Sequence, residues 1–538
     1  MVVTKHLLFA IVQGALCLTI LVQAQNQTGF ISIDCGTTGS RYTDDKTGIT
    51  YVSDTDFIES GENREILPAY KAQIDEQQFW NVRSFPEQIR NCYTLKPSQG
   101  NETRYLIRAR FMYGNYDNKG VGPAFDLHLG ADFWDTVKFK DASSTISKEI
   151  IHVPSSDHIH VCLVNTGRGT PFISVLELRP LENDTYVSET GSLQLLQRYD
   201  FGSTIDQVMR YKDDAYDRLW SPFDTIVWKP LSASLMNDTI SENSFNVPST
   251  VMSTASTKNR SIGFMGIHWE SLNTSTRYFF YMHFAELEKL RRNEYREFNI
   301  SINGNLWYGA LVPEYLSTIT IFSVHGTKPD SEGKITVWFN NTENSTLPPL
   351  VNALEVYQLK DTSVQETYQT DADAILKIKS AYEVKRNWQG DPCLPIAYLW
   401  DGIGCSYDGN NPPRIISLNL SSSGLKGEIS PFIADLTMLQ YLDLSNNSLT
   451  GTVPEFLAQL SFLRVLNLRG NNLMGPLPDI KGSKDGFTFS VDNNVSRNQT
   501  ASPPTGETSS SPEYSFKNYN FLIPLIASVG GFLLNFVA

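Results

Sequence analysis

The sequence has few charged residues and no long run of lysine or arginine. Charged residues fill 19% of its 538 positions, and 44 basic against 58 acidic residues leave a formal net charge of −14 at pH 7. Proteins that hold nucleic acid neutralise phosphates with clustered basic side chains. The composition therefore excludes nucleic acid as a partner. The hydrophobic share of 41% predicts a globular protein with more than one domain.

The sequence also lacks the motifs of familiar catalytic sites. It has no Gly-x-Ser-x-Gly elbow, no His-Glu-x-x-His helix and no phosphate-binding loop. Asp200-Phe201-Gly202 spells the magnesium-binding tripeptide of protein kinases, but the other kinase motifs are missing. Two acidic pairs, Asp213-Asp214 and Glu286-x-Glu288, could hydrolyse glycosides only if the fold placed them face to face. We therefore expect no enzyme, no catalytic residues, no cofactor and no metal.

Cysteine is scarce, with six in the whole chain. Cys17 lies in a segment that we expect to be removed, so the mature chain keeps an odd number. Outside the cell this implies a free thiol or an intermolecular bridge. Cys393 and Cys405 lie close together in a turn-rich segment and form the predicted disulfide. The pairing of the remaining three stays open: Cys35, Cys92 and Cys162.

One of these cysteines belongs to a pattern with two interpretations. The spacing His158-x-His160-x-Cys162 puts three potential ligands on one face of a strand, where imidazole and thiolate could share a metal. The interpretation that we favour leaves the histidines solvated and Cys162 in a disulfide. The apolar residues between them then form the buried face: Ile159, Val161 and Leu163.

Residues 1–24 read as a cleaved signal peptide. Lys5 is followed by an apolar run from Leu7 to Val22 and a small residue at Ala24. Asn-x-Ser/Thr sequons are scattered along the whole chain, as on a glycosylated exterior. We expect the secretory pathway and the extracellular face of the plasma membrane. The glycosylation candidates are Asn26, Asn101, Asn183, Asn237, Asn259, Asn273, Asn299, Asn340, Asn344, Asn419, Asn446, Asn494 and Asn498.

The C-terminal end predicts attachment to a membrane. A Ser/Thr/Pro-rich stalk at 483–520 precedes a hydrophobic tail at 521–538 that carries no charge. Small residues at 509–511 and a polar spacer match the signal for a glycosylphosphatidylinositol anchor. A tail that spans the membrane or is cut short is the equal alternative, because no basic residue follows it.

Between these ends the sequence repeats itself. Arg104–Phe111 resembles Arg277–Phe284, and Phe125–Gly130 resembles Phe298–Gly304, both at an offset of 173 residues. Runs of β-branched and aromatic residues alternate with polar ones and end at Gly, Pro, Asn or Asp. We expect a mainly β protein with two copies of an antiparallel β-sandwich, at 25–190 and 191–362.

From residue 363 the pattern of hydrophobic residues changes. Residues 363–414 predict a connector helix, with Thr370 or Asp371 placed to cap it, and a disulfide cap. From 415 to 482 a period of 24 residues repeats three times, as Leu418, Leu442 and Leu466 show. This spacing is typical of leucine-rich repeats, whose leucines fill a solenoid while an Asn side chain bonds turn backbone inside the coil.

Six segments stand out by their composition and order: Phe30–Gly36, Asn91–Tyr93, Val161–Gly167, Met282–Glu286, Asn387–Cys393 and Trp400–Gly402. Together they resemble the extracellular part of plant malectin-like, leucine-rich-repeat receptor kinases. The resemblance implies tandem malectin-like sandwiches, a short solenoid, one membrane span and an intracellular kinase. In some members the stretch Gly390-Asp391-Pro392-Cys393 is associated with proteolytic release of the malectin-like part, so these residues form the predicted processing motif.

The chain departs from this family in two ways. A kinase is absent from the sequence, and no second cysteine pair follows the last repeat between Phe487 and Asn494. We expect a receptor-like ectodomain or co-receptor that binds an extracellular peptide, a cell-wall carbohydrate or a partner receptor, and that signals through a partner kinase. The alternatives are a truncated decoy of a receptor kinase and, more remotely, a secreted carbohydrate-active enzyme.

The ligand-binding residues cannot be identified from the sequence. Sugar recognition uses aromatic faces and convergent hydrogen-bonding groups, but aromatic residues can equally pack the sandwiches, which is the interpretation that we favour. The aromatic residues near strand ends or loops are Tyr113, Tyr116, Phe133, Trp134, Trp307 and Tyr308.

Overall fold

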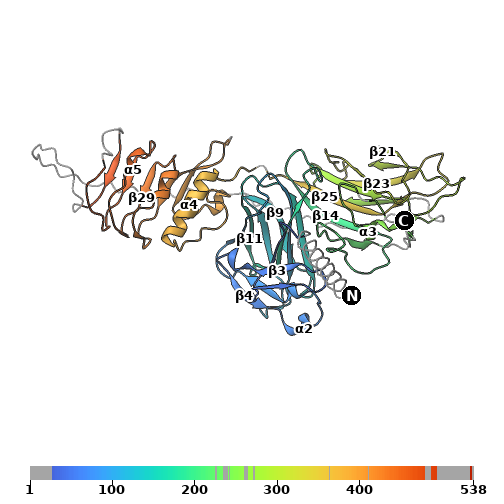
Figure 1. Cartoon of the computed structure of the whole chain (residues 1–538), viewed down its shortest axis with the longest axis horizontal. Helices are drawn as coiled ribbons and strands as arrows, with labels where there is room; N and C mark the ends of the chain where they lie inside the picture. The colour runs from blue at the N-terminus through green and yellow to red at the C-terminus, as the bar shows by residue number, and fades with distance from the viewer. Residues whose placement is uncertain are drawn as a thin grey trace, which may run out of the picture. The chain divides into compact units, whose positions relative to one another are not determined.

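The computed structural model describes residues 27–223, 227–233, 240–241, 243–259, 265–270, 273–362, 364–409, 411–478 and 486–492, and the backbone of 534–535. The chain divides into two compact units (Figure 1). The first takes in Met1–Glu366, Trp388–Tyr398 and Leu533–Ala538, and the second takes in Thr367–Asn387 and Leu399–Phe532. The predicted signal peptide, and the tail apart from 534–535, lie outside the described residues.

One large sheet runs through the whole of the first unit. Ten of its 11 strands are hydrogen-bonded in a continuous order, and β15 (Ser221–Phe223) pairs with β14 beside this path. That order is β2 (Arg41–Thr43), β3 (Thr50–Ser53), β1 (Ile31–Asp34), β13 (Val175–Leu181), β7 (Arg104–Met112), β10 (Thr145–His152), β14 (Ser192–Phe201), β25 (Ala353–Lys360), β19 (Tyr278–Phe284) and β22 (Ile319–Phe322).

Each half of this sheet has a smaller antiparallel partner sheet. In the first half the order is β6 (Arg90–Leu95), β11 (Ile159–Arg168), β8 (Ala124–Leu129) and β9 (Asp132–Lys138). In the second half it is β21 (Asn305–Leu311), β20 (Phe298–Ile302), β23 (Lys334–Asn341), β18 (Met265–Glu270) and β33 (Leu534–Asn535).

Short elements complete the first unit. Two three-stranded sheets join β12 (Phe172–Ile173), β5 (Asn81–Ser84) and β4 (Glu62–Glu65), and β16 (Trp228–Ser232), β17 (Thr254–Lys258) and β24 (Leu350–Val351). The helical turns are η1 (Asp54–Asp56), α2 (Pro68–Lys71), η2 (Gln77–Phe79), α3 (Ser249–Met252) and η3 (Ile396–Tyr398).

Alternation of apolar and polar residues explains why these segments form strands. In β8, Phe125, Leu127 and Leu129 are buried, while the residues between them are half-exposed. The same alternation occurs in β20. Because successive side chains point to opposite faces of a strand, each sandwich gains a core, and a fully buried side chain of this size contributes about 1.5–3 kcal/mol. The prediction of tandem β-sandwiches is confirmed.

The two sandwiches share the large sheet through the pairing of β10 with β14. Ile150 lies opposite Gln194 and Ile151 opposite Leu193. A row of buried charges crosses the same junction, with acidic and basic side chains alternating from strand to strand. The row consists of Glu177 on β13, Arg108 on β7, Glu149 on β10, Arg198 on β14 and Glu355 on β25.

The contacts in this row are short. Arg108 Nε donates to Glu177 Oε2 at 2.7 Å, and Arg198 Nε donates to Glu355 Oε2 at 2.7 Å. Burial alone would raise the pKa of Glu355, but the neighbouring Arg198 and His283 outweigh it and hold that pKa well below its ordinary value. Glu355 therefore stays charged, and the ion pairs of Arg198 with Glu149 and Glu355 connect the two sandwiches.

The second unit is a short solenoid preceded by a helix. The helix α4 spans Gln369–Tyr382, and β26 (Ile403–Ser406) pairs antiparallel with the first strand of the coil. The parallel strands are β27 (Arg414–Asn419), β29 (Tyr441–Asp443), β31 (Val465–Asn467) and β32 (Thr488–Ser490). Its other elements are β28 (Lys426–Gly427), η4 (Pro431–Asp435), β30 (Ser448–Leu449) and α5 (Phe456–Gln459).

The interior of the solenoid follows the repeat. Leu418, Leu442 and Leu466 lie opposite one another and are fully buried. Asn447 Nδ2 donates to the carbonyl oxygens of Leu420 and Leu444 at 2.8 and 2.9 Å. The predicted leucine-rich solenoid is confirmed.

Two details of this unit differ from the sequence-based expectations. The helix cap is Tyr368 and makes no side-chain cap bond, so capping by Thr370 or Asp371 is wrong. Asp371 instead accepts hydrogen bonds from Arg414 Nε and Ile415 N at 2.9 and 2.8 Å. The sheet also continues into β32, within the segment assigned to the stalk. Its Phe489 lies opposite Leu466. The leucine pattern does not reveal this turn of the coil, because an aromatic residue takes the place of leucine and the spacing is shorter than in the preceding repeats.

Among the described residues, none of the helices has the length and hydrophobicity needed to cross a membrane.

Candidate functional site

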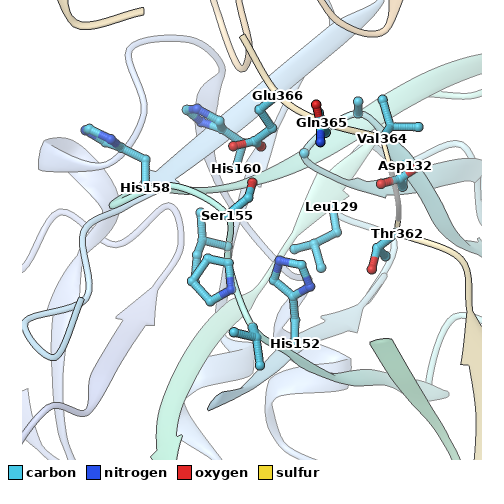
Figure 2. A pocket seen from close by; sticks show the side chains of 15 residues that line it. Leu129, Asp132, His152, Ser155, His158, His160, Thr362, Val364, Gln365 and Glu366 are labelled. Atoms are coloured by element: carbon cyan, nitrogen blue, oxygen red, sulfur yellow. The ribbon is translucent and has the colours of Figure 1, made fainter. Parts of the chain in front are cut away.

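A pocket of about 200 Å³ lies in the first sandwich. Three segments form it: the turn between β8 and β9, the connection from β10 to β11, and, after β25, Thr362 with Val364–Glu366. Figure 2 shows Glu366 and His160 on one side of the pocket and Asp132 and Thr362 on the other. Loops held by a rigid sheet are common places for binding residues.

Two carboxyl groups line the pocket. Burial, followed by the nearby negative charge of Asp361, raises the pKa of Asp132 to about 6. Burial, followed by the charge of Asp391, raises the pKa of Glu366 to about 7. Ser156 Oγ donates to Glu366 Oε2 at 3.0 Å. Both acids therefore sit where their ionised forms are poorly solvated.

Two of the three histidines that line the pocket, His152 and His160, do not balance these acids. His152 Nδ1 lies 2.7 Å from Ser192 Oγ, and His160 Nδ1 lies 3.2 Å from Thr94 Oγ1. Burial lowers the pKa of His152 to about 4 and that of His160 to about 3. Both imidazoles are neutral near pH 6, so they offer hydrogen bonds and no positive charge.

Gly130 makes room for one of the acids. It has a φ of +55° in the β8–β9 turn, and a Cβ there would lie 2.6 Å from Glu366 Oε1. A glycine accepts this left-handed conformation without strain. The turn therefore combines a backbone conformation that favours glycine with a close approach of the Glu366 carboxylate.

The segment Trp388–Tyr398 packs on the first sandwich. Gln389 Oε1 accepts a hydrogen bond from the backbone N–H of Cys92 on the edge strand β6 at 2.9 Å. Gly390 has a φ of +70°, and a Cβ there would meet Arg90 Nη1 at 2.8 Å and Cys92 Sγ at 2.9 Å. The sequence placed this segment in the connector, but its packing places it with the sandwich.

The predicted processing motif lies within this segment. Its four residues, Gly390–Cys393, are buried. Asp391 Oδ1 accepts hydrogen bonds from the backbone N–H groups of Cys393 and Leu394 at 2.9 and 2.8 Å. These two hydrogen bonds stabilise a turn of the backbone after Asp391. Processing at this motif stays a prediction.

The structure resolves the cysteines that the sequence left open. Cys92 on β6 is bonded to Cys162 on β11, and these residues lie directly opposite each other. Cys35 is a buried free thiol. Cys393 and Cys405 are both disulfide-bonded, and their pairing with each other stays a prediction.

The disulfide also decides between the two interpretations of the His-x-His-x-Cys pattern. A bridged Cys162 offers no thiolate, so the shared metal site is wrong. Ile159, Val161 and Leu163 are buried as expected. The expectation of solvated histidines is wrong, because His158 is buried and pairs with Asp157, and His160 is half-buried in the pocket.

The acidic pairs and the kinase-like tripeptide have structural partners. Asp214 Oδ2 accepts from Arg218 Nε at 2.8 Å, and Glu286 Oε2 accepts from Arg296 Nε at 2.7 Å. Asp200 is buried and accepts from Thr254 Oγ1 at 3.0 Å. Each of these acids is engaged in holding loops or strands.

The aromatic residues divide between packing and surface. Tyr113, Tyr116 and Trp134 are buried, so they pack the first sandwich as favoured above. Phe133 and Tyr308 are exposed by 44% and 39%, and Trp307 is half-buried. None of the six lines the pocket.

The sequons within the described residues lie mostly on the surface. Asn299 and Asn419 are half-buried. Asn26, Asn237, Asn494 and Asn498 lie outside the described residues. The exposed sequon asparagines are Asn101, Asn183, Asn259, Asn273, Asn340, Asn344 and Asn446.

Sequence reasoning missed the pocket residues Asp132 and Glu366. They are far apart in the chain, and neither belongs to a recognisable motif. Gly130 in a predicted turn was the single local signal, and turns commonly contain glycine for reasons unrelated to binding.

Comparison with known proteins identifies both units. The sequence pattern of the malectin-like domain matches residues 33–359, and that of leucine-rich repeats (2 copies) matches 437–482. A probable leucine-rich-repeat receptor-like serine/threonine-protein kinase of Arabidopsis thaliana is 51% identical over 431 residues, which are 79% of this chain and 49% of that protein. A putative leucine-rich repeat receptor-like serine/threonine-protein kinase of Arabidopsis thaliana is 48% identical over 428 residues, which are 79% of this chain and 48% of that protein. The chain spans about half the length of the curated relatives it matches.

Solved structures share the fold. The ANX2 ectodomain from Arabidopsis thaliana is 16% identical, with a TM-score of 0.50, and the match covers 62% of this chain and 97% of that one. The plant receptor-like kinase FER is 17% identical, with a TM-score of 0.50 and coverages of 62% and 96%. At this identity the match concerns the fold alone.

Proposed function

Because this chain belongs to the malectin-like domain family, we propose that it is the ligand-binding ectodomain of a plant cell-surface receptor. The observation that carries the proposal is the match to receptor-like kinases across the sandwiches and the solenoid. The match covers 49% and 48% of the length of the two relatives named above. Function on such folds resides in sites, and the pocket of the first sandwich is the site that we assign to ligand recognition.

The architecture supports recognition rather than catalysis. The buried charge row connects strands of the two sandwiches. Three of the four candidate catalytic acids, Asp214, Glu286 and Glu288, are held in ion pairs with arginines. A carbohydrate-active enzyme would release new reducing ends from plant cell-wall oligosaccharides incubated with the full-length chain, and we expect none.

Signal transfer requires a kinase domain. We assign it to a partner receptor kinase that the ligand-bound ectodomain contacts. A decoy form that sequesters ligand is the alternative, and full-length transcript sequencing separates the two. A decoy shares its 5′ exons with a kinase-encoding transcript of the same gene.

The proposal places the folded domains outside the cell. Labelling of intact cells with a membrane-impermeant biotin reagent tests this, with a cytosolic protein as the control. Biotin on lysines of both units supports it, and labelling only after permeabilisation refutes it. Phosphatidylinositol-specific phospholipase C then distinguishes a lipid anchor, which it releases, from a spanning tail, which it leaves in the membrane.

A further inference from the structure

We propose that the pocket of the first sandwich binds the side chain of a lysine or arginine in an extracellular peptide. This inference rests on the proposed receptor function and names the chemistry of its ligand. The pocket combines two acidic groups, an apolar wall and the volume of a single side chain, and each feature supports the assignment separately.

The acids of the pocket lack a positive charge within it. Among the residues that line it there are two carboxylates, Asp132 and Glu366, but no lysine or arginine. The guanidinium of Arg90 lies outside this lining and donates to the carbonyl oxygen of Gly130 at 2.9 Å and to that of Gln389 at 3.4 Å. Its charge acts against the burial that raises the pKa of Glu366, but it does not outweigh that burial. A ligand cation would pair with the two acids and favour their ionised forms.

The charges next to the two acids include further acids as well as the guanidinium of Arg90. Asp361 and Asp391 raise the pKa values of Asp132 and Glu366, respectively. Lys360, on the strand that leads to the pocket, has its ammonium 5.3 Å from the centre of the Phe133 ring. An anionic ligand such as a uronic acid would therefore meet repulsion, whereas a cation would be attracted.

The mouth of the pocket is apolar. Val153 and Val364 are exposed by 43% and 44%, although both are large hydrophobic residues. Leu129, Pro154 and Ile159 continue the apolar lining inward. Lysine and arginine place an aliphatic stem against apolar surface while a charged tip reaches polar groups. This division matches the arrangement in Figure 2, where Leu129 lies between the side of Glu366 and that of Asp132.

The lining of the pocket disfavours a sugar. Sites for whole small molecules enclose roughly 300–1,000 Å³, so about 200 Å³ suits one side chain or one sugar unit. Sugar units are held by stacking on aromatic rings, and no phenylalanine, tyrosine or tryptophan lines this pocket. Val153 and Val364 give an aliphatic stem the contact that a ring would give a sugar.

The test is a ligand-observed NMR titration of the full-length chain at pH 7.5. The probe is N-acetyl-lysine methylamide, and its Nζ-acetylated analogue is the neutral control. We expect saturable binding of the charged probe, at least tenfold weaker binding by Asp132→Asn or Glu366→Gln, and unchanged binding by Glu102→Gln. Glu102 is an exposed acid outside the pocket.

Three results would overturn the proposal: equal binding of the neutral analogue, equal binding by the Asp132→Asn/Glu366→Gln double variant, or no saturable binding. Binding of methyl β-glucoside in place of the lysine probe would assign the pocket to sugars. Any of these results combined with saturable binding of apoplastic peptides to the full-length chain rejects the pocket chemistry and keeps the receptor function. Loss of both rejects the receptor function.

Discussion

Arg198 Nη2 donates a hydrogen bond to Glu149 Oε1 at 2.7 Å and thereby joins β14 of the second sandwich to β10 of the first. Both side chains are almost completely buried, and the other side of the same guanidinium binds Glu355. Strand pairing between β10 and β14 is short. The charge pair therefore supplies a second connection across the junction, and removing either partner would leave a buried charge unpaired.

Replacement of Arg198 by methionine should weaken the junction strongly. Removing one partner of a buried ion pair leaves an uncompensated charge and costs about 3–5 kcal/mol. We expect this loss in the free energy of unfolding measured with urea. The matched control is Arg64→Met, because Arg64 pairs with Glu62 on the surface and such pairs contribute roughly 0–1 kcal/mol. Equal effects of the two substitutions would show that the charge row does not hold the sandwiches together.

Replacement of Gly390 by alanine should lift the segment Trp388–Tyr398 from the sandwich. The new Cβ would collide with Arg90 and Cys92. Gly167→Ala is the control, since Gly167 has a φ of +78° but no atom within 4 Å of the added carbon. Limited proteolysis followed by mass spectrometry should show faster cleavage within 388–398 in the Gly390 variant alone. Identical cleavage patterns in both variants would mean that the close packing of Gly390 against Arg90 and Cys92 does not hold the segment in place.

The thiol of Cys35 should stay unreactive in the folded protein. It is fully buried, and burial followed by the nearby charge of Asp54 raises its pKa well above the ordinary value. Thiolates are the reactive form of cysteine. Iodoacetamide should therefore label Cys35 only after unfolding, and peptide mapping without reduction should find Cys92 linked to Cys162. The same map tests the predicted pair Cys393–Cys405, and fast labelling of Cys35 at pH 7 would contradict its burial.

The stability of the chain should depend on pH through Glu366. Its folded pKa of about 7 lies above the ordinary value of 4.5. The ionised form therefore destabilises the fold, and wild-type stability falls as pH rises from about 4.5 through 7. Glu366→Gln should be more stable than wild type at pH 8, by about 3 kcal/mol at most, and equal to it at pH 4. Urea unfolding at both pH values measures this, and an equal gain at pH 4 would refute the titration of Glu366.

Local patterns revealed more of the fold than of the site. The leucine period located the solenoid, because Leu418 and its equivalents must fill one interior at a fixed rise. Alternation in Phe125–Leu129 revealed a half-buried strand. The pairing of Arg108 with Glu177 and of Arg198 with Glu149 depends on strand register between distant segments, which composition does not specify. The turn at Phe489 was missed because phenylalanine replaces leucine there.

The pocket was hidden for a similar reason. Asp132 begins β9 inside the first sandwich, whereas Glu366 follows β25, the last strand of the second, and the return of the chain after β25 brings them to one cavity. The close packing of Gly390 could not be predicted from the sequence either, since a glycine in a motif is most simply explained by a turn. Its packing against Cys92 requires the disulfide and the edge of β6 to be placed first.

Saturation binding of labelled apoplastic peptides to living cells that display the full-length chain tests the receptor assignment most directly. Control cells display an unrelated surface protein at the same level. We predict a peptide fraction that binds saturably to the displayed chain and that is displaced by the unlabelled fraction. Equal binding of every fraction to both cell types would contradict the assignment.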